Sequence, residues 1–129
     1  MNRTLLLYGL GLWLVGTIVL RMASEYLLHP GSFTRTLALF ALSFLATGWL
    51  ARRLCLRLGL GAELWPAGAV SLAVPTLLLD SLSTAFFPTV FPNIAPAAAG
   101  LFGGCMLSCR AGALVAATLG LQARAAGRR

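Results

Sequence analysis

The chain has 129 residues, of which 59% are hydrophobic and only 10% are charged, and its mean hydropathy is +0.88. Soluble domains carry about 25% charged residues, so this composition excludes a domain with a water-facing surface and indicates a membrane protein. The net charge of +7 comes entirely from arginines, and in so apolar a chain it indicates orientation in a membrane rather than binding to nucleic acid.

Four apolar stretches predict four spanning helices. They cover about residues 4–28, 33–53, 65–87 and 96–121. Each is close to the roughly 20 residues that cross a bilayer. The first is similar to a signal peptide in having Arg3 before a short apolar core, but no small-residue cleavage site precedes Arg21. The expected fold is therefore all-α, an integral membrane four-helix bundle formed by one domain over residues 1–129.

The arginines predict how these helices are oriented. One side of the membrane would hold Arg3, Arg52, Arg53, Arg57, Arg124, Arg128 and Arg129. The opposite side would hold only Arg21 and Arg35. By the positive-inside rule both termini are then cytoplasmic. The absence of lysine beside many Ala, Leu and Gly residues is typical of a GC-rich bacterial genome, so we expect a multi-pass protein of the bacterial inner membrane.

At the outer end of the first helix, Arg21 and Glu25 are four residues apart and can pair on one helical face. This is expected to be an interfacial salt bridge, and the alternative is an outward-facing polar vestibule that the two residues line with Asp80. His29 stands alone in an outer-loop turn. Since Ser24, His29 and Asp80 have no nucleophile motif around them, a hydrolase triad is not supported.

The third helix carries an acid, Asp80, about seven residues from its outer end and so roughly 10 Å deep. Asp80 shares a helix face with Thr76, Ser83 and Thr84. A lipid-facing carboxylate at this depth is costly, so this polar face is expected to point into the bundle or a wet cleft. Pro75 is expected to kink the helix.

Arg110, inside the fourth helix, is the expected counter-charge of Asp80. It lies roughly 20 Å from the outer end, so the axial gap is about 9 Å, but the two side chains lean toward each other. A charge at the bilayer centre costs about 2.5 to 3.5 kcal/mol on insertion scales, and pairing offsets part of that. The pair can be structural, or it can be a proton, ion or substrate site. Arg21 is a rival partner for Asp80.

The segment between the third and fourth helices is predicted to be an outer cap that rests on the bundle. Pro88, Pro92 and Pro96 are spaced by four and cannot continue a regular helix comfortably. Asn93 can satisfy the backbone groups that the prolines free. The aromatic residues expected to anchor this segment at the membrane interface are Phe86, Phe87 and Phe91.

Small residues recur at every fourth position of the fourth helix. They are Gly100, Gly104, Ser108, Gly112, Ala116 and Gly120. Such a stripe lets helix backbones approach closely, so we expect a tight helix contact within the chain, with a homodimer contact as the alternative. Cys55, Cys105 and Cys109 are expected to be packing thiols, and the sequence carries no metal, cofactor or phosphate-binding motif.

Three segments carry a resemblance to a known family. They are GLWLVGTIVLR at residues 11–21, LLLD ending at Asp80, and FFPTVFPN at residues 86–93. In these segments and in layout the chain resembles a family of small, uncharacterised four-span bacterial membrane proteins, to which no activity is assigned. The resemblance implies that Arg21, Asp80, Pro92 and Asn93 define the type, without implying what they do.

Two functions fit these observations. The first is a polar intramembrane site around Asp80, Arg110 and Arg21, used for proton-linked transport or small-molecule binding. The second is a structural or accessory subunit that packs against a larger membrane protein. An intramembrane enzyme is disfavoured because no catalytic motif is present. The expected partners are the lipid bilayer and either a second copy or a larger membrane protein, with no nucleic acid.

Overall fold

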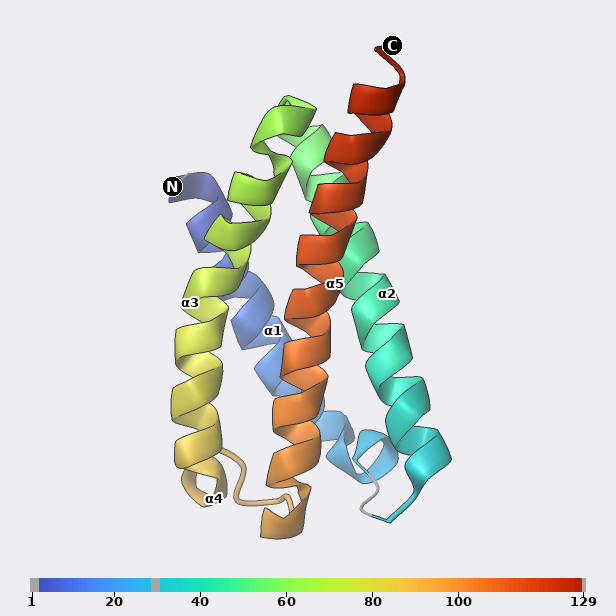
Figure 1. Ribbon diagram of the computed structural model, residues 1–129. Helices are drawn as coiled ribbons and strands as arrows, with labels where there is room; N and C mark the ends of the chain where they lie inside the picture. The colour runs from blue at the N-terminus through green and yellow to red at the C-terminus, as the bar shows by residue number, and fades with distance from the viewer. Residues whose placement is uncertain (1–2, 29–30, 129) are drawn as a thin grey trace.

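The computed structural model describes residues 3–28 and 31–128, and it is helical almost throughout (Figure 1). The long helices are α1 (Arg3–Leu27), α2 (Phe33–Arg57), α3 (Trp65–Ala85) and α5 (Ala99–Ala126). The short ones are η1 (Ala62–Leu64), α4 (Phe87–Val90) and η2 (Pro96–Ala98). No strand occurs in these described ranges. His29 and Arg129 lie outside them.

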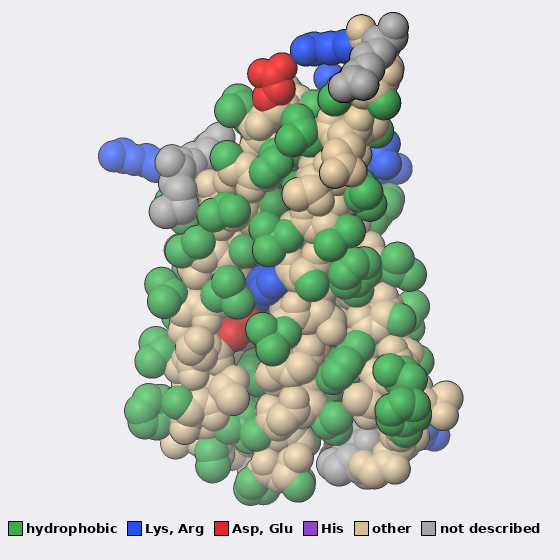
Figure 2. Space-filling model, viewed as in Figure 1, with side chains coloured by type: hydrophobic (Ala, Val, Ile, Leu, Met, Phe, Trp, Pro, Cys, Tyr) green, Lys and Arg blue, Asp and Glu red, His purple; other side chains and the backbone are tan. Residues whose placement is uncertain are grey.

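The four long helices confirm the predicted all-α class. Counted with η1 and η2, which lead directly into α3 and α5, each is long and apolar enough to cross a membrane. Charged side chains on the face seen in Figure 2 gather at the two ends of the molecule, except near mid-height between α3 and α5. Length, composition and the distribution of charge therefore identify a membrane protein.

The helices do not end where the apolar stretches end. α2 runs on to Arg57 and α5 to Ala126, past the predicted residues 53 and 121. Arginine is a good helix former, so a helix continues into water after its hydrophobic residues stop. α3 instead ends at Ala85, two residues before the prediction, because Pro88 offers no N–H to continue the helix.

The most extensive packing joins α2 and α5, which are not consecutive among the long helices. α1 packs along α3, α3 along α5, and α5 along α2. α5 therefore lies between α3 and α2 (Figure 1). Among the described residues α1 and α2 do not form an extensive contact, although a short loop joins them. Both ends of the chain lie at the same end of the bundle in Figure 1.

Glycines set the close contact between α2 and α5. A Cβ atom on Gly112 would collide with the backbone carbonyl of Phe44, and one on Gly48 would lie 2.9 Å from the carbonyl oxygen of Gly112. Closer to the N-terminal end of α5 in the same contact, a Cβ on Gly104 would lie 2.5 Å from the ring of Phe40. The two backbones therefore meet within this chain at a distance that only glycine permits.

The small-residue stripe of α5 is not uniform. Gly120 faces the indole ring of Trp65 on α3 rather than α2, and Ser108 is half-buried. Gly100, the first member of the stripe, has open space where its Cβ would be. Only the middle of the stripe therefore lies in the α2 contact.

Phenylalanines form the core at the end of the bundle opposite the chain termini. The rings of Phe87, Phe91 and Phe102 lie with centroids 4.9 to 5.7 Å apart, and Phe87 and Phe91 are 2% and 0% exposed. The expectation that these two anchor the segment at the interface is wrong, because α4 turns them inward onto α5. Phe86, which is 61% exposed, faces outward.

Candidate functional site

The bundle encloses an ion pair at mid-height. Nη2 of Arg110 on α5 donates a hydrogen bond to Oδ2 of Asp80 on α3. The Asp80 side chain is 8% exposed and that of Arg110 is 13% exposed. Figure 2 shows acidic and basic side chains adjoining between α3 and α5, with hydrophobic side chains around them. The two helices run in opposite directions, so both side chains lean toward their own N-termini and toward each other.

Three buried polar atoms at this place have no hydrogen-bond partner among the described residues: Oδ1 of Asp80, Nε of Arg110 and Nε1 of Trp13. Trp13 belongs to α1, and its indole N–H is close enough to the Asp80 carboxylate to act on it as a hydrogen-bond donor, although the two do not meet hydrogen-bond geometry. Buried polar atoms are hydrogen-bonded in about 90% of cases or more, and each unpaired one costs about 1–3 kcal/mol. The protein alone therefore satisfies the ion pair only in part.

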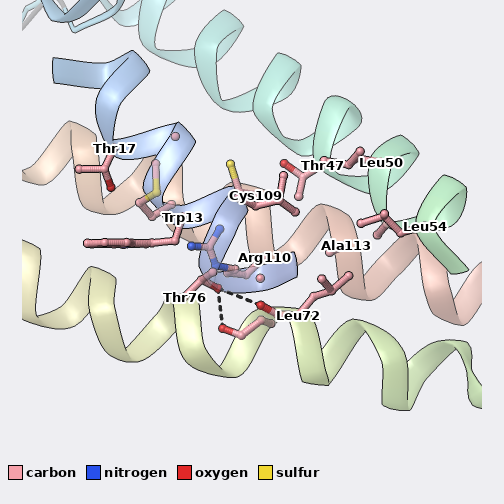
Figure 3. A pocket seen from close by; sticks show the side chains of 16 residues that line it. Trp13, Thr17, Thr47, Leu50, Leu54, Leu72, Thr76, Cys109, Arg110 and Ala113 are labelled. Carbon is pink, nitrogen blue, oxygen red and sulfur yellow. Dashed lines mark hydrogen bonds between the residues drawn. The ribbon is translucent and has the colours of Figure 1, made fainter. Parts of the chain in front are cut away.

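A cavity of about 210 Å³ lies beside the pair, among all four long helices, and we call it the central cavity. Its polar lining residues are Trp13, Thr17, Thr47, Thr76, Cys109 and Arg110. The rest of the lining is apolar, with leucines from α1, α2 and α3. Figure 3 shows Trp13, Thr76 and Arg110 lying together at the edge of this space. It is thus an apolar chamber with a small polar corner.

A second, more open hollow lies between α3 and α5, and we call it the lateral groove. Its volume is about 470 Å³, and Asp80, Thr84 and Met106 are among the residues that line it. Asp80 lines this groove while Arg110 lines the central cavity, and Met106 lines both. The ion pair therefore forms part of the partition between the two spaces.

The hydroxyl groups expected near Asp80 bond to backbone rather than to its carboxylate. Thr76 donates to the carbonyl oxygen of Ala73 at 2.7 Å, and Thr84 donates to the carbonyl oxygen of Asp80 itself at 2.8 Å. Ser83 is buried, whereas Thr84 is exposed. The predicted polar side chains are thus present on α3, but they do not bond to the Asp80 carboxylate. Within the described residues, Arg110 is its hydrogen-bond donor.

Arg21 does not belong to this site. Its side chain is exposed near the C-terminal end of α1, and the ion-pair partner of Asp80 is Arg110. Glu25 is also exposed, and no ion pair joins it to Arg21 in the part of the chain that is described. The predicted Arg21–Glu25 bridge is therefore wrong, because solvated charges at a helix end gain little from pairing.

The outer cap is fastened to α1 by one side chain. The amide of Asn93 donates to the backbone carbonyl oxygen of Arg21 at 2.7 Å. Pro88 lies in the first turn of α4, where a proline is tolerated. Pro92 follows the end of that helix, and both prolines are exposed. The backbone of Arg21, not its charge, is what the cap contacts.

The cysteines of α5 lie on the α2 side of the cavity. The thiol of Cys105 and the hydroxyl of Ser43 share a hydrogen bond of 3.3 Å, and Cys109 lines the cavity one turn further on. The described residues contain no group of three or more His, Cys, Asp or Glu side chains that could hold a metal ion.

Sequence reasoning missed the α1 and α2 side of the site, including Trp13, Thr17 and Thr47. Trp13 carried a usable signal. Tryptophan in membrane proteins gathers at the two interfaces, whereas Trp13 lies near the middle of α1. A buried indole N–H usually finds a partner, so a tryptophan at this depth already indicates a polar group nearby.

Comparison of the sequence with known protein families finds one match. The model of a family of unknown function, DUF5367, matches residues 59–123. The match covers α3, the outer cap and most of α5, and so includes both members of the ion pair. The chain therefore belongs to this family. No curated protein and no solved structure gives a significant match.

Proposed function

We propose that this member of the family binds a small molecule inside the membrane, in the central cavity, with the Asp80–Arg110 pair as the polar part of the site. The observation that carries the proposal is the set of unpartnered buried atoms on a charged pair that borders an open chamber. A pair kept only for packing gains most when its remaining atoms are bonded within the protein. Here two of these atoms, and Nε1 of Trp13 beside them, lack a partner among the described residues and can bond to a ligand.

The shape of the site supports binding of a small ligand. Ligand sites are mostly apolar concavities in which a few polar groups converge, typically of about 300–1,000 Å³ for drug-sized molecules. The central cavity has this composition with a volume of about 210 Å³. The ligand is therefore small, or it inserts only one end.

Transport linked to protons would extend this binding function. Asp80 faces the lateral groove and Arg110 faces the central cavity, so a proton or cation that replaced Arg110 on Asp80 would release the guanidinium toward the cavity. The two spaces would then be coupled through one ion pair, which is the minimal arrangement that ion-linked movement of a ligand requires.

The proposed location is the bacterial inner membrane with cytoplasmic termini. The end of the bundle where both ends of the chain lie also carries the C-terminal ends of α2, with Arg52, Arg53 and Arg57, and of α5, with Arg124. Arg53 stacks over the ring of Trp49 at 5.0 Å, an arrangement suited to a membrane interface. By the positive-inside rule this end faces the cytoplasm.

An accessory role remains the second candidate because some small residues face open space. Gly11 on α1, and Gly100 and Gly103 on α5, have no atom within 4 Å of where a Cβ would be. Small residues on a lipid-facing surface let another helix approach closely. A second copy of the chain or a larger membrane protein could dock there without involving the cavity.

Two glycines of α1 allow a matched test of binding. Gly16 lines the cavity and Gly11 does not, and both have open space at the Cβ position. Gly16→Leu should therefore fill the cavity without a backbone clash, and Gly11→Leu is its control. In lipid nanodiscs, wild type and Gly11→Leu should bind an eight-carbon amphipath saturably above partitioning into empty nanodiscs. Gly16→Leu should not.

Equal binding by both variants would place any ligand elsewhere. If no eight-carbon amphipath binds wild type saturably, while Gly11→Leu disrupts a complex isolated from native membranes, the accessory role replaces the binding function.

A further inference from the structure

The buried atoms on the lining of the central cavity that lack a hydrogen-bond partner are donors. The unpartnered atoms on its lining residues are Nε1 of Trp13 and Nε of Arg110, and both carry hydrogen. The hydroxyls of Thr47 and Thr76 already donate to backbone carbonyl oxygens, each at 2.7 Å. A ligand that satisfies this corner must bring an acceptor atom.

The positive charge of Arg110 at this polar end of the cavity is already balanced by Asp80. The guanidinium of Arg110 is bonded directly to the Asp80 carboxylate, so an incoming anion would meet Arg110 and be repelled by Asp80 at close range. Weak screening in a buried site makes this repulsion strong. An ammonium head would be repelled by Arg110 and has no acceptor to offer. A neutral head group with an acceptor atom can bond to both Trp13 and Arg110 without being repelled by either member of the ion pair.

The remainder of the cavity suits a hydrocarbon body. Leu12, Leu50, Leu54, Leu72 and Met106 line it. α1 and α2 border the cavity without packing extensively on each other. The entrance expected for an apolar molecule dissolved in the bilayer is therefore between these two helices.

We propose that the central cavity takes a neutral, largely apolar molecule from the bilayer, whose carbonyl-type oxygen accepts hydrogen bonds from Trp13 and Arg110. This inference rests on the proposed binding function and names its ligand class. Ketones, aldehydes, esters and quinones share the required oxygen, and a carboxylate or an amine does not fit.

Three eight-carbon molecules separate the head groups at nearly constant size. Nanodiscs that hold the full chain are titrated calorimetrically at neutral pH with 2-octanone, octanoate and octylamine. Binding of 2-octanone should be saturable and at least tenfold tighter than that of the two charged molecules. Trp13→Phe keeps an aromatic ring but loses the N–H, so it should weaken 2-octanone binding about fivefold, as expected for one hydrogen bond.

Trp49→Phe is the matched control, because Trp49 is exposed on α2 and does not line the cavity. It should bind 2-octanone like wild type. Helicity and size-exclusion profiles establish that each variant is folded. If Trp13→Phe also binds like wild type, the indole serves Asp80 rather than a ligand and the donor assignment is wrong.

The same titrations distinguish failure of the neutral ligand class from failure of the proposed binding function. Tighter binding of octanoate or octylamine that is lost in Gly16→Leu overturns the neutral ligand class and leaves the binding function in place. Absence of saturable binding for all three molecules, or equal binding by Gly16→Leu, overturns both.

Discussion

Arg110 on α5 bonds to the carboxylate of Asp80 on α3, and the pair is buried on both sides. The other ion pair in the described residues, Arg128–Glu63, joins exposed side chains at a helix end. Only the first can change the free energy of unfolding by much, because exposed pairs contribute little. It also connects the two helices that the family match covers together.

Removing one charge should cost more stability than removing both. Asp80→Asn leaves Arg110 buried without a counter-charge and should lower the free energy of unfolding by about 3–5 kcal/mol. The double variant Asp80→Asn/Arg110→Met removes both charges and should recover much of that loss. Unfolding titrations of the purified protein in mixed micelles measure both. An Asp80→Asn protein as stable as wild type would show that the pair has no structural role.

Two glycines of α5 should respond in opposite ways to alanine. Gly112→Ala places a Cβ against the Phe44 carbonyl and should destabilise the protein by about 1–3 kcal/mol, the usual cost of overpacking. Gly100→Ala meets open space and should be neutral, or stabilising by up to about 1 kcal/mol through helix propensity. Thermal unfolding of the two variants side by side checks this. Equal effects would mean that the α2–α5 contact is wrongly placed.

Two phenylalanines of the segment between α3 and α5, Phe91 and Phe86, should differ in how much they contribute to stability. Phe91→Ala opens a cavity in the cluster with Phe87 and Phe102 and should cost about 3–5 kcal/mol. Phe86→Ala removes an outward-facing ring and should change stability by less than about 0.5 kcal/mol, as exposed substitutions usually do. The yield of monodisperse protein after heating ranks the two. The reverse order would support interfacial anchoring by the segment instead.

A reporter fused after the last residue should be active in the cytoplasm. The arginines of the α2 and α5 ends lie on the same side as both ends of the chain, and positive charge is retained on the cytoplasmic side. Paired fusions to alkaline phosphatase and to green fluorescent protein give the readout, since only the second is active inside the cell. Phosphatase activity would invert the proposed orientation.

The sequence predicted the four spans and named Arg110 as the expected counter-charge of Asp80, but it left Arg21 as a rival partner. Spans follow from the thickness of the bilayer. The depths of the two charges leave an axial gap of about 9 Å, and the opposed lean of the two side chains is what favours Arg110 as the partner. The neighbours of α1 could not be predicted in this way. Its apolar residues surround the helix, so hydropathy does not indicate which face meets α3, and Gly9 acquires meaning only against the backbone of Leu72.

Which phenylalanines are buried could not be predicted from the sequence either. Phe86 and Phe87 are adjacent and identical, yet one is exposed and the other buried. The difference depends on how α4 turns after Ala85, which is tertiary information. Trp13 escaped notice for a related reason, because its importance comes from the charges on two other helices.

The order in which the helices pack has a consequence for how the protein is made. α2 is synthesised second, but it meets α3 only sparsely and finds its main partner in α5, the last helix. Asp80 also waits for α5, since its counter-charge is Arg110. Synthesis proceeds from the N-terminus, so a nascent chain holds an unpaired helix and an unpaired acid in the membrane until its final span enters. Completion of the bundle and neutralisation of the acid then happen in one late step.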